Sequence, residues 1–389
     1  MDRSCHEVSK PDAAPAVTRP PDLNVLAAGL LHDLAILQSS ERSRFGYTRA
    51  AKVLAAGIDR SIADLIEEGT LRDVPYIGAS TERIAVELVK TGRSASVDRA
   101  VEASARRGEV EKRRRYRRGY LSRHAMRLAL DAPLPASIVS TRAYHGDLQM
   151  HSTWSDGVES IGSLADAACE LGWPRIGVTD HSYGLPVARG MSMEAAARQH
   201  HEIDKVNARF SGRVRVYKGV EANILVDGSL DLSEDERGLF EYVIASPHSA
   251  LRKETDQTAR MLSAVTLPGI AILGHPQGRM YNTRPGISAD WTKVFKEAAR
   301  RGIAIELDGN WHRQDIDHEL AAIALDAGCL FALDSDAHSL GELPFTDYAV
   351  AHARLARIPA DRVVNCWDAP RFEEWLRAQK VPRARRKRR

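Results

Sequence analysis

The sequence predicts an α/β protein with a parallel sheet, preceded by an all-helical region. Short runs of Ile, Val, Leu and Ala recur between residues 175 and 333, and most of them end at a histidine or a carboxylate. The predicted strands are Arg175–Thr179, Val214–Lys218, Tyr242–Ala245, Ile270–Leu273, Ile303–Glu306 and Leu330–Leu333. Side chains at the C-terminal ends of parallel strands converge on one face of an α/β barrel. At 389 residues the chain also exceeds the ~250–300 residues of a single core, so we expect two domains.

The N-terminal part of the chain predicts a helical domain over residues 22–100. Residues 1–21 are polar and rich in proline, which is typical of a disordered lead-in. Helical periodicity then predicts four helices, the third capped by Ser61 and the last ending at Gly92: Leu23–Gln38, Arg44–Ala56, Ser61–Glu68 and Ala79–Lys90.

Residues 101–141 are predicted to form a basic helical segment and a linker. The basic part, Glu109–Arg127, has Tyr116 and Tyr120 among its cations, and the linker is Asp131–Ser140. Two interpretations remain open: a solvated helix face, or a surface that contacts a phosphate backbone. The candidate DNA-binding residues here are Arg113, Arg114, Arg115, Arg117 and Arg118.

The chemistry is concentrated in a series of polar motifs. In order they are GDLQMHSTWSDG (146–157), TDHS (179–182), Gly219-Val220-Glu221, SPHS (246–249), GHPQGR (274–279) and DSDAHS (334–339). Histidine and carboxylate side chains gathered at one face bind divalent metals, and several such ions together suit phosphoryl transfer. A single histidine at a strand end is usually structural, but repeated placement favours a metal site.

These motifs, in this order, resemble the PHP (polymerase and histidinol phosphatase) family. They are most similar to the PHP module at the C-terminus of bacterial family X DNA polymerases, from about residue 143 to about residue 367. The resemblance implies a distorted (βα)7-type barrel over residues 142–370. A terminal helix and a basic tail then occupy residues 371–389, and the tail is either a solubilising extension or a nucleic-acid anchor.

The same resemblance implies two or three divalent ions, Mn²⁺ or Zn²⁺ with Fe²⁺ and Mg²⁺ as alternatives. It assigns Gln149, His151, Glu221 and Asp336 to the first ion, with Glu221 bridging to a second ion held by His248 and His275. Asp156, His181 and His338 would hold the third. Gln149 departs from the usual HxH pair, and its neutral amide oxygen implies either weaker binding of the first ion or a preference for Mn²⁺ over Zn²⁺.

Other site residues are expected around these ligands. Glu221 and Arg279 are the predicted catalytic residues, with the Arg279 fork facing the substrate phosphate; a structural ion pair is its alternative. Asn310, Arg313 and Asp315 are predicted at the rim, and Asp180 and Asp334 are expected to orient histidine ligands.

The region of about 23–100 resembles the small N-terminal domain of family X polymerases, with a helix-hairpin-helix motif. The DNA-binding positions it implies are Ile77, Gly78 and Ser80, although Tyr76 stands where a glycine is usual. Ile84 occupies the position of the lyase lysine, so lyase activity is not expected. Residues 100–142 are too short for a polymerase palm, so polymerase activity is not expected either.

We therefore expect a phosphoesterase acting on DNA in repair, as a 3′–5′ exonuclease, a 3′-end processing enzyme or an AP endonuclease. The alternatives are a small-molecule phosphatase of the histidinol-phosphate type and a DNA-binding scaffold with a decayed metal site. No run of ~18 apolar residues predicts a membrane span, and the four cysteines include no CxxC pair. Both observations favour a cytoplasmic protein, and DNA is its expected partner because of the helical domain and the basic segments.

Overall fold

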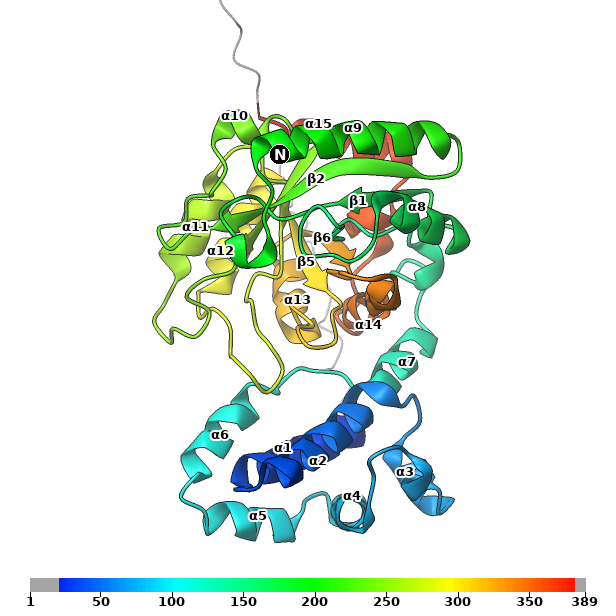
Figure 1. The fold of residues 1–389 in the computed structure, drawn as a ribbon, viewed down its shortest axis with the longest axis vertical. Helices are drawn as coiled ribbons and strands as arrows, with labels where there is room; N and C mark the ends of the chain where they lie inside the picture. Colours follow the sequence, from blue (N-terminus) through cyan, green and yellow to red (C-terminus); the bar gives the residue numbers. More distant parts are fainter. Residues whose placement is uncertain (1–20, 382–389) are drawn as a thin grey trace, which may run out of the picture.

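The computed structural model describes residues 21–381 and shows two parts stacked along the long axis of the molecule (Figure 1). An α/β barrel forms the larger part, and a helical domain lies at one end of it. The predicted lead-in, apart from Pro21, and most of the predicted basic tail fall outside the described residues. Within residues 21–381, none of the helices has the length and apolar character needed to cross a membrane.

The barrel is built on a curled sheet that, within the described residues, has six parallel strands in sequential order. The strands are β1 (Arg175–Val178), β2 (Arg215–Ile224), β3 (Tyr242–Pro247), β4 (Ile272–Leu273), β5 (Ala304–Asp308) and β6 (Leu330–Asp334). They are almost entirely buried, as expected of a parallel sheet covered by helices. The predicted α/β class and its strands are confirmed. However, β2 continues to Ile224, so Glu221 lies inside a strand rather than after one.

The first motif links the two edge strands of this sheet. The Gly177 amide of β1 donates to the carbonyl of Asp147 at 2.8 Å, and the Thr179 amide donates to that of Met150 at 2.9 Å. On its other side, Met150 forms a parallel bridge with Ala337, just beyond β6. The seventh position of the expected barrel is thus taken by an irregular segment, residues 147–150, which carries Gln149 and leads directly into His151.

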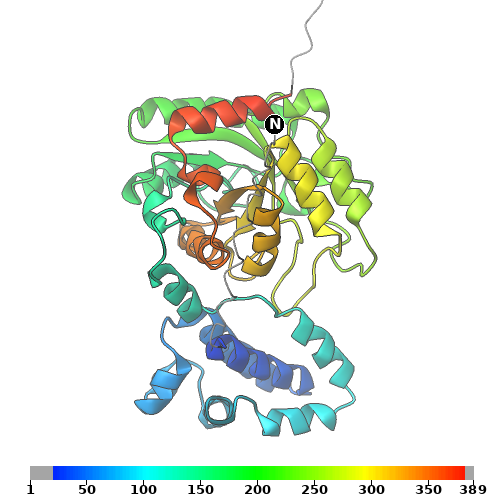
Figure 2. The same ribbon diagram turned by 180° about the vertical axis from the view of Figure 1, so that it is seen from behind.

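Helices cover the outside of the sheet (Figures 1 and 2). They are α8 (Ile161–Glu170), α9 (Met193–Arg209), α10 (Glu234–Arg237), α11 (Thr258–Thr266), α12 (Trp291–Arg301), α13 (His318–Asp326), α14 (Thr346–Leu355) and α15 (Ala369–Gln379). The main core lies between the strands and these helices. A second cluster joins strand residues to Phe372 and Trp375 of α15, at the end of the barrel opposite the helical domain.

The helical domain has a core of its own. Its elements are α1 (Leu23–Leu37), α2 (Glu41–Lys52), a π-helical turn η1 (Val53–Gly57), α3 (Ile62–Glu67), a 3₁₀ turn η2 (Leu71–Asp73), α4 (Ala79–Thr91), α5 (Ala95–Glu102), α6 (Arg107–Arg115) and α7 (Arg123–Asp131). The predicted helices are present within a few residues. The second starts earlier than predicted because the Ser40 hydroxyl caps it, and α4 ends at Gly92, whose φ is 73°.

The helical domain packs on the loops that follow the strands. The Leu121 amide donates to Gln314 Oε1 at 2.8 Å, and the Tyr120 hydroxyl donates to the carbonyl of His312 at 3.2 Å; both partners lie in the loop after β5. Helix α7 also packs along α14, which follows β6. The helical domain therefore lies at the same face of the barrel as the C-terminal strand ends.

Candidate metal centre

The structure brings all nine predicted metal ligands together at the C-terminal ends of the strands. They come from the first motif (Gln149, His151, Asp156), the loop after β1 (His181), β2 itself (Glu221), the loops after β3 and β4 (His248, His275) and the loop after β6 (Asp336, His338). Most are buried, while Asp156, His248 and His338 are partly exposed at the mouth of the site. Three overlapping groups of these residues are close enough to hold an ion each.

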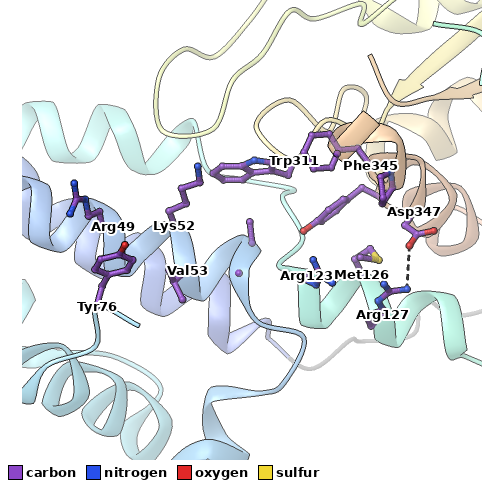
Figure 3. A pocket seen from close by; sticks show the side chains of 15 residues that line it. Arg49, Lys52, Val53, Tyr76, Arg123, Met126, Arg127, Trp311, Phe345 and Asp347 are labelled. Atoms are coloured by element: carbon purple, nitrogen blue, oxygen red, sulfur yellow. Dashed lines mark hydrogen bonds and ion pairs between the residues drawn. The ribbon is translucent and has the colours of Figure 1, made fainter. Parts of the chain in front are cut away.

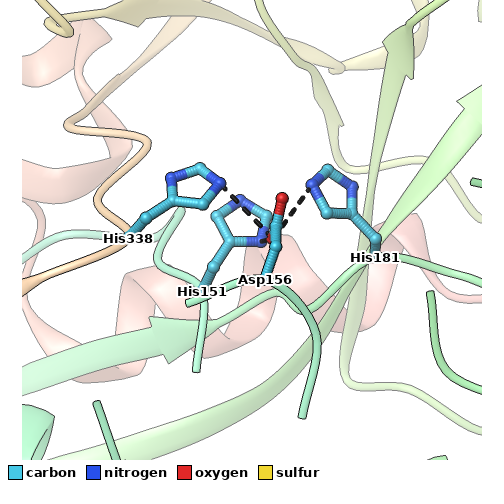
Figure 4. A group of neighbouring side chains, drawn as sticks. All are labelled: His151, Asp156, His181 and His338. Carbon is cyan, nitrogen blue, oxygen red and sulfur yellow. Dashed lines mark ion pairs between the residues drawn. The ribbon is translucent and has the colours of Figure 1, made fainter. Parts of the chain in front are cut away.

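Asp156 forms the centre of the most exposed group (Figure 4). Its Oδ1 lies 3.6 Å from His181 Nε2, 3.4 Å from His338 Nε2 and 3.9 Å from His151 Nδ1. Burial raises the pKa of Asp156, but hydrogen bonding to His338 and the charges of the three histidines outweigh it and lower the pKa to about 2. This carboxylate is therefore ionised and flanked by ring nitrogens, as a metal ligand must be.

The two oxygens of Glu221 face different histidines. Oε1 lies 2.9 Å from His275 Nε2 and 3.4 Å from His248 Nε2. Oε2 lies 3.0 Å from His181 Nδ1 and 3.5 Å from His151 Nε2. Neither oxygen makes a contact with hydrogen-bond geometry, although both are fully buried. A carboxylate placed between two sets of nitrogen donors fits two cations a few ångströms apart, with one oxygen on each.

Gln149 is buried beside Asp336, and its amide nitrogen lies 3.5 Å from Asp336 Oδ1. Its Oε1 atom is buried and has no hydrogen-bond partner among the described residues, which is costly unless a cation is bound there. His151 Nε2 lies 3.1 Å from the same carboxylate oxygen. The residues present thus fit the first predicted ion, with Gln149 as an oxygen donor.

Replacing Gln149 by leucine should weaken binding of one divalent ion by about tenfold or more, because one oxygen ligand is lost while the others stay in place. Gln149→His is the matched counterpart, and it should bind Zn²⁺ at least as tightly as the wild type. Competition titration with a chromophoric chelator measures both. Identical Mn²⁺ affinities for the wild type and Gln149→Leu would show that Gln149 is not a ligand.

Asp180 and Asp334 do not orient the histidines, contrary to prediction. Asp180 accepts bonds from the Ser152 amide at 2.8 Å and from Gln199 Nε2 at 2.6 Å. Asp334 accepts the Leu148 amide at 2.8 Å. Both carboxylates hold the backbone of the first motif in place, and they position Gln149 and His151 only through that backbone.

Arg279 does not face the metal centre, so its predicted catalytic role is wrong. Its Nη1 lies 2.6 Å from Asp317 Oδ2, its Nε donates to the carbonyl of Arg313 at 3.1 Å, and its guanidinium lies 4.0 Å above the ring of Tyr120. The side chain is buried between the barrel and the helical domain. Arg279 thus forms a structural ion pair within the barrel, and its contact with the Tyr120 ring connects the two domains. The predicted rim residue Asp315 is also fully buried, and it accepts the Arg279 amide at 3.2 Å.

Other cations approach the centre instead. Arg313 Nε lies 3.1 Å from Asp336 Oδ2. A cavity of about 380 Å³ beside His248 is lined by Arg252, Lys253 and Arg284. Burial, followed by the charges of Arg313 and Arg252, lowers the pKa of Arg284 to about 10. Mutually repelling cations next to a metal site form a suitable place for an anionic group. Arg313 was predicted at the rim, but Arg252, Lys253 and Arg284 belong to no motif, and only their position in the fold identifies them.

The predicted hairpin site is present only in part. Ile77 lies in the helical core, and Gly78 is the N-cap of α4, with its amide donating to Thr81 Oγ1 at 2.8 Å. Ser80 is exposed, and its hydroxyl lies 3.4 Å from that of Tyr47. Tyr76 takes the left-handed conformation (φ 68°) that a glycine would adopt more easily, and its side chain is 60% exposed. The backbone turn is therefore formed, but a large ring stands beside it.

The predicted basic segment does not present one free cationic face. It is divided between α6 and the turn that precedes α7. Arg117 is buried, with Nη1 2.8 Å from Asp33 Oδ1, and Arg114 Nε lies 2.7 Å from the other oxygen of that carboxylate. Arg113 donates to the carbonyl of Asn282 in the barrel at 2.5 Å. Of the five predicted DNA-binding arginines, only Arg115 and Arg118 are exposed and outside these contacts.

Comparison with known proteins identifies similarities over the barrel. Residues 147–309 match the model of the PHP domain family. A relative from Bacillus subtilis (strain 168), named DNA polymerase/3'-5' exonuclease PolX, is 36% identical over 60% of this chain and 41% of its own length. A relative from Photobacterium profundum, named probable phosphatase PBPRB2022, is 31% identical over 38% of this chain and 56% of its own length. The chain thus spans less than two thirds of each of these relatives. A solved histidinol phosphate phosphatase from Lactococcus lactis covers 54% of this chain and 94% of its own, at 17% identity and a TM-score of 0.43.

Proposed function

We propose that the protein is a divalent-metal-dependent phosphoesterase that processes DNA ends, with residues 147–309, which match the PHP domain family, as its catalytic part. The observation that carries this proposal is the placement of Glu221, with each oxygen facing its own pair of histidines. Two or three ions, Mn²⁺ or Zn²⁺, are the proposed cofactors. The reaction class is 3′–5′ exonuclease, 3′-end processing or AP endonuclease in DNA repair.

The residues of the site have distinct tasks in this proposal. Glu221 holds two cations at a fixed spacing, and Asp156 with its histidines holds a third at the mouth. When bound, the ions would polarise the phosphoryl oxygens and lower the pKa of the attacking water. Arg284, with Arg252, receives the charge of the phosphate at the side of His248. Arg313 holds Asp336 in position through the contact between its Nε and Asp336 Oδ2.

DNA is the proposed substrate because of what surrounds the centre. The helical domain contacts the loops after β4 and β5, on the face where the ligands gather. A small ester would need only the cavity beside His248. The PolX relative's name also includes a 3'-5' exonuclease activity.

A small-molecule phosphatase is the second candidate, favoured by the relatives named probable phosphatases. One of these, YcdX from Escherichia coli (strain K12), matches this chain over 90% of its own length at 26% identity. The match covers 57% of this chain, so the rest of the chain lies outside it. The same metal centre would serve either substrate.

With Mn²⁺ present, the full chain should shorten or cleave a 3′-recessed, nicked or abasic duplex, and His248→Ala should lose this activity by about 10²-fold or more. His201→Ala is the matched control, because His201 is an exposed histidine on α9. Gel analysis of end-labelled DNA and release of inorganic phosphate from histidinol phosphate give the two readouts. Efficient hydrolysis of histidinol phosphate with all three duplexes intact would reject the DNA proposal in favour of the phosphatase.

A further inference from the structure

A deep cleft separates the helical domain from the barrel loops (Figure 3). Its larger cavity, about 710 Å³, has Arg49, Lys52 and Tyr76 on the helical side and Trp311 and Phe345 on the barrel side. In Figure 3 Lys52 extends from its helix toward the Trp311 ring, and the distance from its Nζ to the ring centroid is 5.6 Å. The two domains thus meet across the cleft at a cation–π contact.

The cleft continues past this contact. A second cavity of about 650 Å³ is also lined by Lys52 and Trp311, together with Arg44, Arg106 and the loop that contains Tyr281 and Thr283. Since both cavities share the same two residues, they lie on either side of the Lys52–Trp311 contact. Together they form one groove along the interface between the domains.

The groove is strongly cationic. The basic residues that line it are Arg44, Arg49, Lys52, Arg106, Arg113, Arg123 and Arg127. Two carboxylates also line it, and each is paired with an arginine. Glu109 Oε1 lies 3.6 Å from Arg113 Nη2, and Asp347 Oδ2 lies 3.2 Å from Arg127 Nη1. Within residues 21–381, Arg49, Lys52 and Arg123 have no carboxylate within 4 Å, and of the three Arg123 is the one whose charge acts on Asp347. Such an excess of positive charge favours a polyanion.

Aromatic rings alternate with these cations. Tyr76 is 60% exposed, and Trp311 and Phe345 are half-buried in the wall of the groove. Arg49 lies 5.6 Å from the centroid of the Tyr76 ring. Cations beside exposed rings are the surface on which a single strand binds, since its bases are free to stack while its phosphates meet the charges. In a duplex the base faces are covered, so stacking favours the single-stranded form.

The groove borders the metal centre through two short connections. Arg313, two residues after Trp311, contacts the proposed ligand Asp336 at 3.1 Å. On the other wall, Phe345 ends the 3₁₀ segment Leu340–Phe345, and Glu342 of that segment accepts the amide of the proposed ligand His338 at 2.8 Å. Both walls of the groove are therefore continuous along the chain with loops that carry proposed ligands.

We propose that this groove binds single-stranded DNA and directs the end of a strand into the metal centre. Cleavage of that end in the metal centre rests on the proposed function. Binding of the strand in the groove does not require catalysis. The proposal assigns the phosphate contacts to Arg49, Lys52 and Arg123 and the base stacking to Trp311. The groove includes none of the predicted hairpin residues Ile77, Gly78 and Ser80, and it shares only Arg113 with the predicted basic-segment site.

The test is the affinity of a fluorescein-labelled fifteen-nucleotide oligothymidylate for the full chain, measured by anisotropy with the catalytic metal chelated. Lys52→Glu and Trp311→Ala should each weaken binding about tenfold or more, and Lys52→Glu should lower the log–log salt slope by about 0.7 or more. Matched controls are Arg42→Glu and Phe45→Ala, both exposed on α2 and outside the groove; each should bind within twofold of the wild type. Thermal unfolding of each variant confirms that the fold is intact.

The outcomes separate the two proposals. If folded Lys52→Glu and Trp311→Ala bind the oligomer as tightly as the controls, or if the wild type does not bind it, the groove is not a DNA site. If the variants lose binding as expected but the wild type with Mn²⁺ cleaves no DNA, the groove proposal stands and the proposed function fails. Photo-crosslinking of a 5-bromodeoxyuridine oligomer should mark Trp311, and a crosslink confined to residues 77–80 would favour the hairpin instead.

Discussion

Glu221→Gln should remove more than one divalent ion per chain and lower phosphoester hydrolysis by about 10³-fold or more. The carboxylate is buried, and its two oxygens face His248 and His275 on one side and His151 and His181 on the other. An amide has one oxygen and no charge, so it cannot offset the repulsion between two neighbouring cations. Elemental analysis of the purified variant measures the ions per chain.

A second buried acid provides the control. Glu306 is fully buried, and it accepts the backbone amide of His275 at 2.5 Å. Burial, and next the charges of Asp334 and Asp308, hold the pKa of Glu306 well above its ordinary value, so an amide resembles its protonated form. Glu306→Gln should therefore keep its full metal content. If Glu221→Gln keeps the same metal content as Glu306→Gln, Glu221 does not bridge two ions.

Arg117→Ala should lower the free energy of unfolding by about 3 kcal/mol, because it leaves the buried Asp33 with only one of its two arginines. The guanidinium of Arg117 contacts Asp33, the carbonyl of Gly29 at 2.6 Å and Asn282 Oδ1 of the barrel at 2.8 Å. The substitution therefore removes contacts within the helical domain, to Asp33 and Gly29, and a contact with the barrel, to Asn282. Urea unfolding followed by circular dichroism measures the change.

Arg115→Ala is the matched control, since Arg115 is exposed in the same basic segment and should change the free energy of unfolding by no more than about 0.5 kcal/mol. The double variant Asp33→Leu/Arg117→Met should recover part of the loss, because it removes both buried charges. Equal stability of Arg117→Ala and Arg115→Ala would mean that the Asp33 contact contributes little. If the loss is as expected, neutralising all five arginines of this segment would perturb the fold as well as any DNA contact, so it would not by itself test DNA binding.

The pattern of strands and ligands could be predicted from the sequence alone. Each buried strand is a local apolar run, and a parallel sheet requires that residues such as His181 and His275 at strand ends meet on one face. The helices of the N-terminal domain are likewise local, with Ser40 and Gly92 setting two of their ends. Local patterns therefore determined the α/β class and the helical domain, and the resemblance of the motifs to the PHP family supplied the set of candidate metal ligands.

The partners of the charged side chains were decided only by the tertiary structure. Arg279 belongs to a motif beside His275, yet its guanidinium is turned toward Asp317 and Tyr120, because the helical domain covers that loop. In the sequence Arg117 belongs to a basic run, but in the fold it is buried and paired with Asp33, which lies 84 positions away. The groove around Lys52 and Trp311 likewise exists only where α2 meets the loop after β5. Charge acts through space, so a cation's role depends on which distant residues the fold brings within a few ångströms, and no spacing along the chain contains that information.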